Sequence, residues 1–339
     1  MRVGSTNRRA DPELIGELRR SAWHESYDEV PLPEVGSEVV DFRAASASEL
    51  FASVRSLRRS DLRTLRLLTT HQGHDVPTIG GVLLFGRDRD RDRYFPDAWI
   101  QAGRFEGTDR RRILDGAEIR SLPVRAVEET IAFVRRNISR EAVIGEVRRV
   151  DRWAFPPAAL REAVVNAVVH THYSQRGGPI RVAVFDDRLE VENPGLLPFG
   201  LTVEDIRRGV SRLRNRVIGR VFHELGLIEQ WGSGIQRMTA ACVEAGLSEP
   251  VLEELGGRFR VTLFRANRSE PHVDPVDQAI LDALERHDGL STSALARLVR
   301  LSPRATRTRL AALVDRGLVV EVGSSTNDPK RRYFRTIAP

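Results

Sequence analysis

The spacing of apolar residues between positions 155 and 174 predicts a helix with two unlike faces. It opens on two prolines, which suit a first helical turn because the missing N–H groups would have had no partner there. Residues four apart lie about 40° apart around a helix, so Glu162, Asn166 and His170 share one narrow face. The pattern alone leaves two interpretations open: a solvated face of an amphipathic helix, or one edge of a buried site.

Other segments have a clear period of their own. Apolar spacing predicts helices over residues 48–58, 60–69, 122–137 and 235–245, and alternation predicts strands over residues 98–105 and 258–264. The runs at 180–185 and 188–192 flank Asp186 and Asp187 and predict a hairpin. Charges of alternating sign at residues 86–98 predict a solvated loop.

From residue 276 onward the pattern changes to three short helices and a hairpin, over residues 276–287, 291–299, 303–316, 318–322 and 332–336. This order is typical of a winged helix-turn-helix, in which the third helix enters the major groove and the wing reaches phosphates. The residues expected to contact double-stranded, operator-like DNA are Arg304, Arg307 and Arg309 on the third helix and Lys330, Arg331 and Arg332 on the wing. The alternative is a winged helix that contacts protein or forms a homodimer.

The length and these elements predict several domains of the α+β fold class. A chain of 339 residues exceeds the usual size of one hydrophobic core. We expect the end of an N-terminal domain with its connector, an α/β segment, a helix–sheet domain, a linker and a winged helix-turn-helix, over residues 1–59, 60–150, 151–265, 266–275 and 276–339.

The composition narrows the class of protein. A formal charge of +6 from 53 basic and 47 acidic residues permits DNA binding, but the local arginines of the last domain are what favour it. Cys242 is the one cysteine and can form no internal disulfide. No uncharged apolar run approaches the roughly 20 residues that span a bilayer, and no N-terminal run is typical of a signal peptide. We therefore expect a cytoplasmic protein that does not contact membranes.

Five strings, in their order and spacing, resemble the family of RecG-related transcriptional regulators. The strings are TIGGVLLFG (78–86), GRFEGTD (103–109), LREAVVNAVVHTHYS (160–174), IRVAVFDDRLEVENPGLLP (180–198) and GLIEQWGSGIQRM (226–238). The resemblance implies a GHKL-like α/β sandwich for the helix–sheet domain. In that family a Schlafen/AlbA-type domain comes first, and the opening residues resemble its last strand. Most of that N-terminal domain is therefore expected to be missing here.

The resemblance implies roles for two residues of the first predicted helix. Glu162 is similar to the glutamate that activates water in GHKL-type ATPases, and Asn166 to the asparagine that holds Mg²⁺ on the phosphates. Both residue types suit these roles, because a carboxylate can orient and deprotonate water and a neutral carboxamide oxygen is a hard ligand. ATP and Mg²⁺ are the cofactors that the resemblance implies.

The resemblance also implies that later residues complete a nucleotide pocket. Asn193 stands where active ATPases have the aspartate of Asp-x-Gly and can accept a hydrogen bond from the adenine amino group, and Gly195 completes that motif. Residues 200–227 occupy the position of the ATPase lid. The residues expected to meet phosphate are Arg212, Arg214 and Asn215 in that region and Gly232, Ser233 and Gly234 in the glycine turn.

These observations predict a DNA-binding transcriptional regulator whose GHKL-like domain senses ATP. Two alternatives stay open: a Mg²⁺-dependent ATPase with Glu162 as the base, and an interaction scaffold that binds no nucleotide. Helicase activity is not expected, because the sequence contains no Gly-x-x-x-x-Gly-Lys-Ser/Thr phosphate loop.

Overall fold

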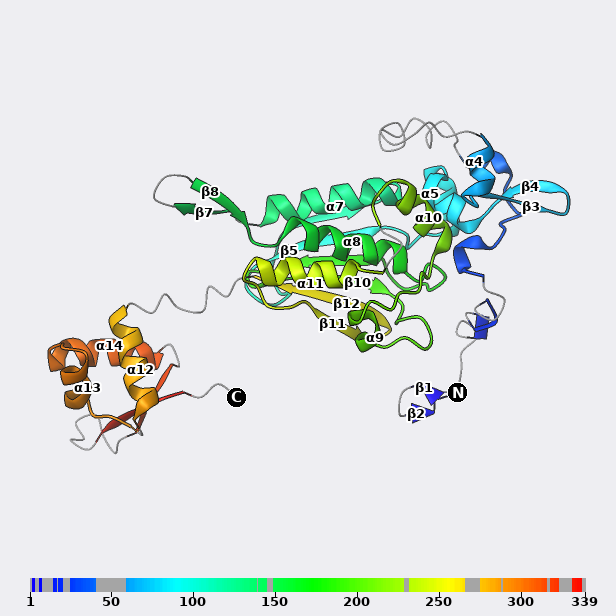
Figure 1. Ribbon diagram of the computed structural model, residues 1–339. Helices are drawn as coiled ribbons and strands as arrows, with labels where there is room; N and C mark the ends of the chain where they lie inside the picture. Colours follow the sequence, from blue (N-terminus) through cyan, green and yellow to red (C-terminus); the bar gives the residue numbers. More distant parts are fainter. Residues whose placement is uncertain are drawn as a thin grey trace. The chain divides into compact units, whose positions relative to one another are not determined.

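The chain divides into two compact units, residues 1–267 and 268–339 (Figure 1). The computed structural model describes residues 2–3, 6–7, 15–16, 18–20, 25–40, 59–138, 140–144, 149–228, 232–265, 275–287, 289–315, 318–322 and 331–336. The helix predicted over residues 48–58, most of the predicted linker and Lys330 lie outside these described residues.

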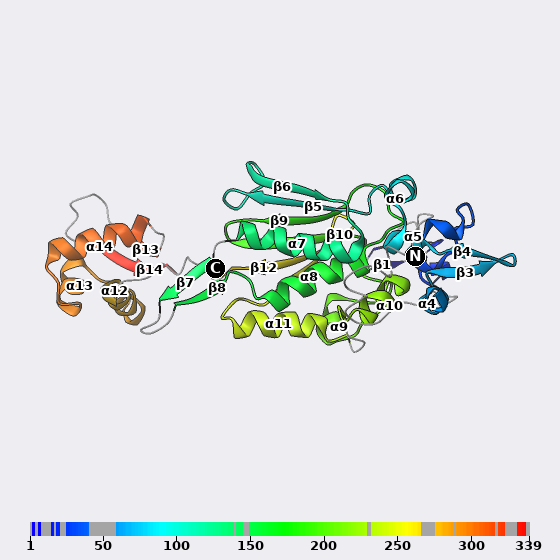
Figure 2. The same ribbon diagram turned by 90° about the horizontal axis from the view of Figure 1, so that it is seen from above.

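A six-stranded mixed sheet forms the centre of the first unit. Its order is β11 (Val251–Leu255), β12 (Arg258–Phe264), β10 (Arg188–Pro194), β9 (Ile180–Val184), β5 (Ile100–Phe105) and β6 (Ile113–Ile119). Only β5 and β9 run parallel; the other neighbours are antiparallel. Figure 2 shows β6 at one edge, beside β5. The strands and the hairpin predicted at residues 98–105, 258–264 and 180–192 are confirmed.

Three helices cover one face of this sheet: α7 (Pro123–Asn137), α8 (Pro157–His170) and α11 (Gly234–Glu244) (Figure 1). The register places the side chains of Val182, Val191 and Val261 at one level of neighbouring strands. All three are buried in the same core as the apolar face of α8. Alternation in the strands and helical spacing in α7 and α8 thus bury matching faces against each other.

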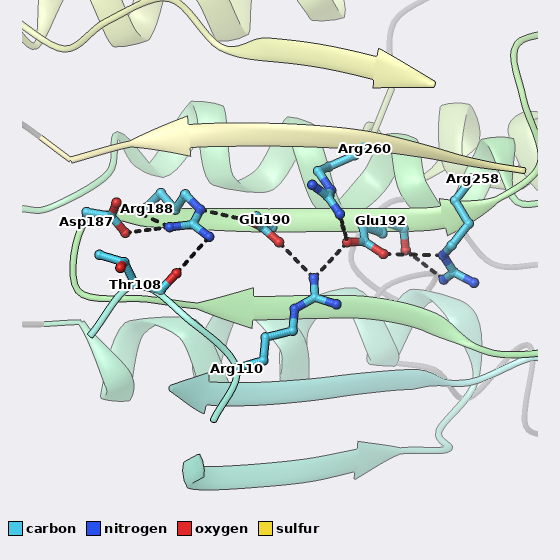
Figure 3. A network of polar contacts seen from close by, with 8 residues as sticks. All are labelled: Thr108, Arg110, Asp187, Arg188, Glu190, Glu192, Arg258 and Arg260. Carbon is cyan, nitrogen blue, oxygen red and sulfur yellow. Dashed lines mark hydrogen bonds and ion pairs between the residues drawn. The ribbon is translucent and has the colours of Figure 1, made fainter. Parts of the chain in front are cut away.

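The opposite face of the sheet carries a network of ion pairs (Figure 3). Glu190 and Glu192 are 5% and 4% exposed, and Arg110 donates to both carboxylates over 2.8 Å. Arg260 donates to Glu192 over 2.8 Å and Arg188 to Glu190 over 2.7 Å. Burial alone would raise the pKa of Glu192, but the hydrogen bonds and charges of Arg110 and Arg260 lower it. Buried carboxylates are stable here because each has several guanidinium partners.

Shorter elements precede and connect these layers. They are β1 (Arg2–Val3), β2 (Thr6–Asn7), the 3₁₀ turns Tyr27–Glu29 (η1) and Ser37–Val39 (η2), α4 (Arg59–Thr64), β3 (Leu68–His71), β4 (His74–Pro77), α5 (Ile79–Phe85), α6 (Asp88–Tyr94), β7 (Arg140–Ile144), β8 (Arg149–Trp153), α9 (Val203–Arg207) and α10 (Arg216–Glu224). The helix predicted over residues 60–69 ends early, because Arg66 takes a φ of 59° and the chain turns into the β3–β4 hairpin.

The predicted solvated loop at residues 86–98 is wrong, since residues 88–94 form α6. Asp90 and Arg91 are 9% and 5% exposed. Arg91 donates to the carbonyl of Arg120 and lies 3.4 Å from Asp88, one turn earlier. The long arginine side chain buries its apolar stem and finds polar partners for its head, which charge alternation alone does not reveal.

The second unit is the predicted winged helix-turn-helix. It contains α12 (Pro275–Arg286), α13 (Thr292–Leu298) and α14 (Pro303–Asp315), followed by the antiparallel pair β13 (Val319–Val322) and β14 (Arg332–Arg335). Its core is a separate apolar cluster that includes Ile280, Leu295, Leu310 and Tyr333. The α+β fold class is thereby confirmed. None of the helices in the described part of the chain has the length and hydropathy to cross a bilayer.

Candidate nucleotide site

A pocket with a cavity volume of about 110 Å³ lies between α8, α11, the sheet and residues 196–216, here called the 196–216 segment. The helix-facing sheet residues Val191, Phe259 and Val261 form part of its apolar lining. Its polar lining includes the predicted residues Glu162, Asn166, Asn193 and Arg212 together with His170, Arg237 and the glycines Gly232 and Gly234. The structure therefore brings together polar residues that are far apart in the sequence, such as Glu162 and Arg237, which are 75 positions apart.

Glu162 and Asn166 contact each other at one side of this pocket. The amide nitrogen of Asn166 donates to Oε1 of Glu162 over 3.0 Å, one helical turn apart. A carboxylate oxygen accepts hydrogen bonds, so the nitrogen of Asn166 must face Glu162. The carboxamide oxygen of Asn166, the atom that could ligate a cation, is left for a ligand.

Arg237, which the sequence analysis did not select, pairs with the other oxygen of Glu162. Its guanidinium donates to Oε2 over 3.2 Å, and the two side chains are 40% and 13% exposed. Arg237 lies in the first turn of α11, three residues after Gly234. The signal that could have found it is this spacing, because a residue one turn into a helix stays near the helix start.

Two glycines bring the start of α11 close to its neighbours. A Cβ at position 234 would overlap Oε1 of Glu162. Gly232 has a φ of +67°, and a Cβ there would lie 2.7 Å from Cβ of Ser211 and 2.8 Å from the carbonyl oxygen of Gly209. Only glycine allows such a backbone approach. Ser233 lies between them at the N-cap of α11 and does not line the pocket.

Asn193 has a fixed amide orientation. It is 4% exposed, and its nitrogen donates to the carbonyls of His170 and Pro194 over 3.4 and 3.1 Å. Both partners are acceptors, so the nitrogen must face them. The carboxamide oxygen therefore remains an acceptor for a donor group in the pocket, as the adenine role requires.

His170 adds a neutral imidazole to the pocket. Burial, together with a smaller effect of the charge of Arg214, lowers its pKa to about 4. The ring is therefore uncharged at neutral pH and can hydrogen-bond without adding a cation.

The structure gives three predicted residues contacts outside this pocket. Asn215 is fully buried, and its amide nitrogen donates to the carbonyls of Val169 and Thr171 over 2.8 and 2.7 Å. Arg214 donates to the carbonyl of Leu196 over 2.7 Å. Gly195 has a φ of +98°, and a Cβ there would overlap this guanidinium. These residues fix the two ends of the 196–216 segment.

The predicted DNA contacts of the second unit divide into two groups. Arg304 and Arg307 are exposed on α14. Arg309 donates to Asp277 of α12 over 2.7 Å, Arg331 to Glu321 over 3.2 Å, and Arg332 to the carbonyl of Gly289 over 3.4 Å. The last three arginines hold elements of this unit together, so Arg304 and Arg307 are the better candidates for contact with a ligand.

Two family models match separate parts of the chain. Residues 177–263 match the family described as "Putative ATP-dependent DNA helicase recG C-terminal", and residues 273–320 match the family described as winged helix-turn-helix DNA-binding. The first match includes Asn193 and the glycine turn, whereas Glu162 and Asn166 lie before it. The chain thus carries an ATPase-like segment followed by a winged helix.

A solved structure shares the fold. The crystal structure of the DIP2311 protein from Corynebacterium diphtheriae is similar with a TM-score of 0.58 and 20% sequence identity, over 99% of this chain and 69% of that one. At this identity the likeness concerns the fold alone. The search of the curated proteins finds no match.

Proposed function

We propose that this protein is a DNA-binding transcriptional regulator that senses ATP in a GHKL-like domain. The observation that carries the proposal is the pocket between α8 and α11, which has Asn166, Asn193 and the glycine turn in its walls or at its edge. The winged helix, which matches a DNA-binding family, supports the second half of the proposal. We expect it to act in the cytoplasm and to bind operator DNA as a homodimer.

The residues of the pocket fit a nucleotide with its magnesium ion. The oxygen of Asn193 suits the amino group of adenine, and the apolar residues Val191, Phe259 and Val261 suit its ring. The oxygen of Asn166 is a hard ligand for Mg²⁺ carried on the phosphates. Main-chain N–H groups at the start of α11 favour anions. Asn166 would hold the Mg²⁺, whose charge would offset that of the phosphates.

The arrangement of Glu162 favours sensing over hydrolysis. A general base needs an oxygen within reach of the water that it deprotonates. Here one oxygen of Glu162 accepts from Asn166 and the other from Arg237. Each oxygen keeps a second lone pair, so these hydrogen bonds compete with a water for Glu162 without excluding it, and turnover would be favoured if Arg237 moved, for example toward a phosphate. The ATPase alternative therefore depends on whether nucleotide binding separates this ion pair.

The variant Asn166→Ala is expected to lower the affinity for Mg²⁺-ATP at least tenfold, which corresponds to about 1.4 kcal/mol. The physical reason is loss of the one carboxamide oxygen on α8 that can ligate the cation. Isothermal titration calorimetry on the full chain measures it, with Glu162→Gln as a control that should retain binding. No heat and no thermal shift for the wild-type chain would instead favour the scaffold alternative. Steady ATP turnover that disappears in Glu162→Gln would favour the ATPase.

The double variant Arg304→Ala/Arg307→Ala is expected to weaken binding to DNA from upstream of its own gene about ten- to hundredfold, roughly 1.4 to 2.7 kcal/mol. These arginines are exposed on α14, where a recognition helix meets bases and phosphates. Fluorescence anisotropy at several salt concentrations measures affinity and the number of phosphate contacts. The control is Arg286→Ala at the end of α12, which removes one exposed positive charge outside α14 where the double variant removes two. Equal losses in both variants would show that general charge, and not α14, determines affinity.

A further inference from the structure

The outer side of β6 is an unpaired edge of the central sheet. β6 is seven residues long and pairs with β5 on one side, and none of the described strands pairs with its other side (Figure 2). The N–H of Gly116 is bonded to Oδ1 of Asp115 over 2.8 Å, a local contact that a second strand would replace. A strand edge of this kind presents N–H and C=O groups that can pair with another chain.

Apolar side chains are exposed at the start of β6. Ile113 and Leu114 are 64% and 51% exposed. Beside them, a hollow of about 420 Å³ lies on the sheet face, and its lining includes Gly103, Gly116 and Ala183. Sheet edges are usually protected by charges, prolines or a covering segment. Two large apolar side chains next to a hollow are instead typical of an interaction surface.

The fold of a single copy does not require a glycine at position 116. Gly116 lies in the middle of β6 and does not have a positive φ. A Cβ there would have one neighbour, the carbonyl oxygen of Ala102 at 3.8 Å, which is an ordinary van der Waals distance. A glycine inside a strand often marks a place where another backbone approaches closely.

The charges around β6 make the strand complementary to a second copy of itself. The side chain of Arg112, just before the strand, is 71% exposed, and that of Glu118, near its end, is 62% exposed. In an antiparallel pair related by a two-fold axis, the start of one strand lies beside the end of the other. An axis through Asp115 therefore places Arg112 of each copy opposite Glu118 of the other. Opposite charges in directly facing positions stabilise a strand pair.

The same axis also matches the sizes of side chains. It places Leu114 of each copy opposite Gly116 of the other, so an exposed apolar side chain lies beside a position that has none. An axis one residue further along, through Gly116, would instead bring Arg112 opposite Arg120. Like charges that face each other destabilise a strand pair, so the axis at Asp115 is favoured.

Like charges oppose pairing less at β6 than at the other edge strand, β11. The two Asp115 side chains would meet at the axis, but each already accepts hydrogen bonds from Asn137 over 2.7 Å and from Arg136 over 3.3 Å. β11 has Glu253 at its middle and Glu254 next to it. A two-fold pairing of β11 would bring these carboxylates together, so β6 is the better edge for a second copy.

We infer that β6 pairs with β6 of a second copy of this chain, antiparallel and with the two-fold axis at Asp115. The two central sheets then form one continuous sheet. A strand edge can pair with itself in this way when its two halves are complementary, as they are here in charge and in size. The inference gives an interface to the homodimer of the proposed function, and it rests on that function in no other respect.

The experiment is sedimentation equilibrium of the full chain over a range of concentrations, without DNA or nucleotide. We expect a dimer whose dissociation constant rises about tenfold or more in Arg112→Glu and in Glu118→Arg, because each change opposes like charges at two symmetric places. The double variant Arg112→Glu/Glu118→Arg should return to within about threefold of the wild type, because both pairs form again with reversed sign. The control Arg208→Glu, 73% exposed on α9 and away from β6 (Figure 2), should have no effect.

These variants are expected to fold. Within one copy, Arg112 pairs with Glu106 and Glu118 pairs with Arg120, and all four side chains are about half exposed or more. Exposed ion pairs of this kind contribute little to stability.

Three results would overturn the inference. A wild-type chain that stays monomeric at every concentration would show that β6 does not pair with a second copy. A dimer that is equally stable in every variant would place the contact on another surface, such as the winged helix. Failure of the double variant to recover would show that Arg112 and Glu118 do not face each other. Nucleotide and operator binding are measured separately, so failure of the proposed function would be distinguishable from each of these results.

Discussion

Replacing Asp28 with alanine is expected to lower the free energy of unfolding of the first unit by about 2–4 kcal/mol at neutral pH. The carboxylate is fully buried. Its two oxygens accept from the main-chain N–H groups of Arg216 and Ile218 in the first turn of α10, each over 2.9 Å. Alanine would leave the buried N–H of Ile218 without this acceptor, at about 1–3 kcal/mol before relaxation, and the N–H of Arg216 with the hydroxyl of Ser26 at 3.3 Å in place of a carboxylate.

Chemical denaturation measures this change, with Glu34→Ala as the matched control. Glu34 is an exposed acidic residue of the same segment, and its removal should change stability by no more than about 0.5 kcal/mol. A loss in Asp28→Ala as small as in Glu34→Ala would mean that water replaces the carboxylate, and that residues 25–40 contribute little to the unit.

The role of Asp28 shows where local sequence patterns stop being informative. Residues 1–59 were expected to be the end of a domain and a connector, because the opening residues resemble a last strand and prolines interrupt the stretch after residue 20. The described residues 25–40 nevertheless pack against the rest of the first unit. Asp28 accepts hydrogen bonds from Arg216 and Ile218, which lie 188 and 190 positions further along the chain. A polar residue in an aperiodic stretch gives no local sign of a partner that far away.

Elements in which the apolar spacing continues over many residues were predicted correctly from the sequence. α7, α8 and the winged helix combine apolar spacing with proline or serine at their starts, so local preference and burial agree. The edge strands β6 and β11 lack that agreement. In β11 only Leu252 is buried among five residues, so no alternation marks it. It is a strand because it pairs with β12, and the sequence pattern of residues 251–255 alone does not predict that pairing.

The residues of the candidate site could be predicted from the sequence only where the family resemblance gave a role to a residue. Asn166, Asn193, Gly232 and Gly234 line one pocket as expected, whereas Gly195 does not. Asn215 does not, because a carboxamide that suits phosphate also suits two main-chain carbonyls, and burial beside the end of α8 decides between them. Arg237 escaped notice for the opposite reason, since an arginine on an amphipathic helix ordinarily suggests a solvated face.

Asp28 and His170 are both expected to make the free energy of unfolding depend on pH. Their contributions are expected to change in opposite directions as pH rises. Burial raises the pKa of Asp28 from 3.8 to about 6. Between those values the folded chain holds a proton that the unfolded chain has released, so this contribution to stability falls as pH rises. Burial, with a smaller effect of Arg214, lowers the pKa of His170 from 6.5 to about 4. There the unfolded chain binds the extra proton, so this contribution rises with pH.

The difference in stability between a variant and the wild type, followed over pH, should therefore show the contribution of the group that the variant removes. From pH 4 to 6, the stability of Asp28→Asn relative to the wild type is expected to increase with pH, and that of His170→Gln to decrease. One proton of difference corresponds to a slope of at most about 1.4 kcal/mol per pH unit. Denaturant unfolding of the three proteins across this range measures both slopes.

The difference from the wild type removes the shared contribution of the exposed carboxylates. Parallel curves for all three proteins would mean that neither group is buried as described, because only a pKa that changes on folding can make stability depend on pH.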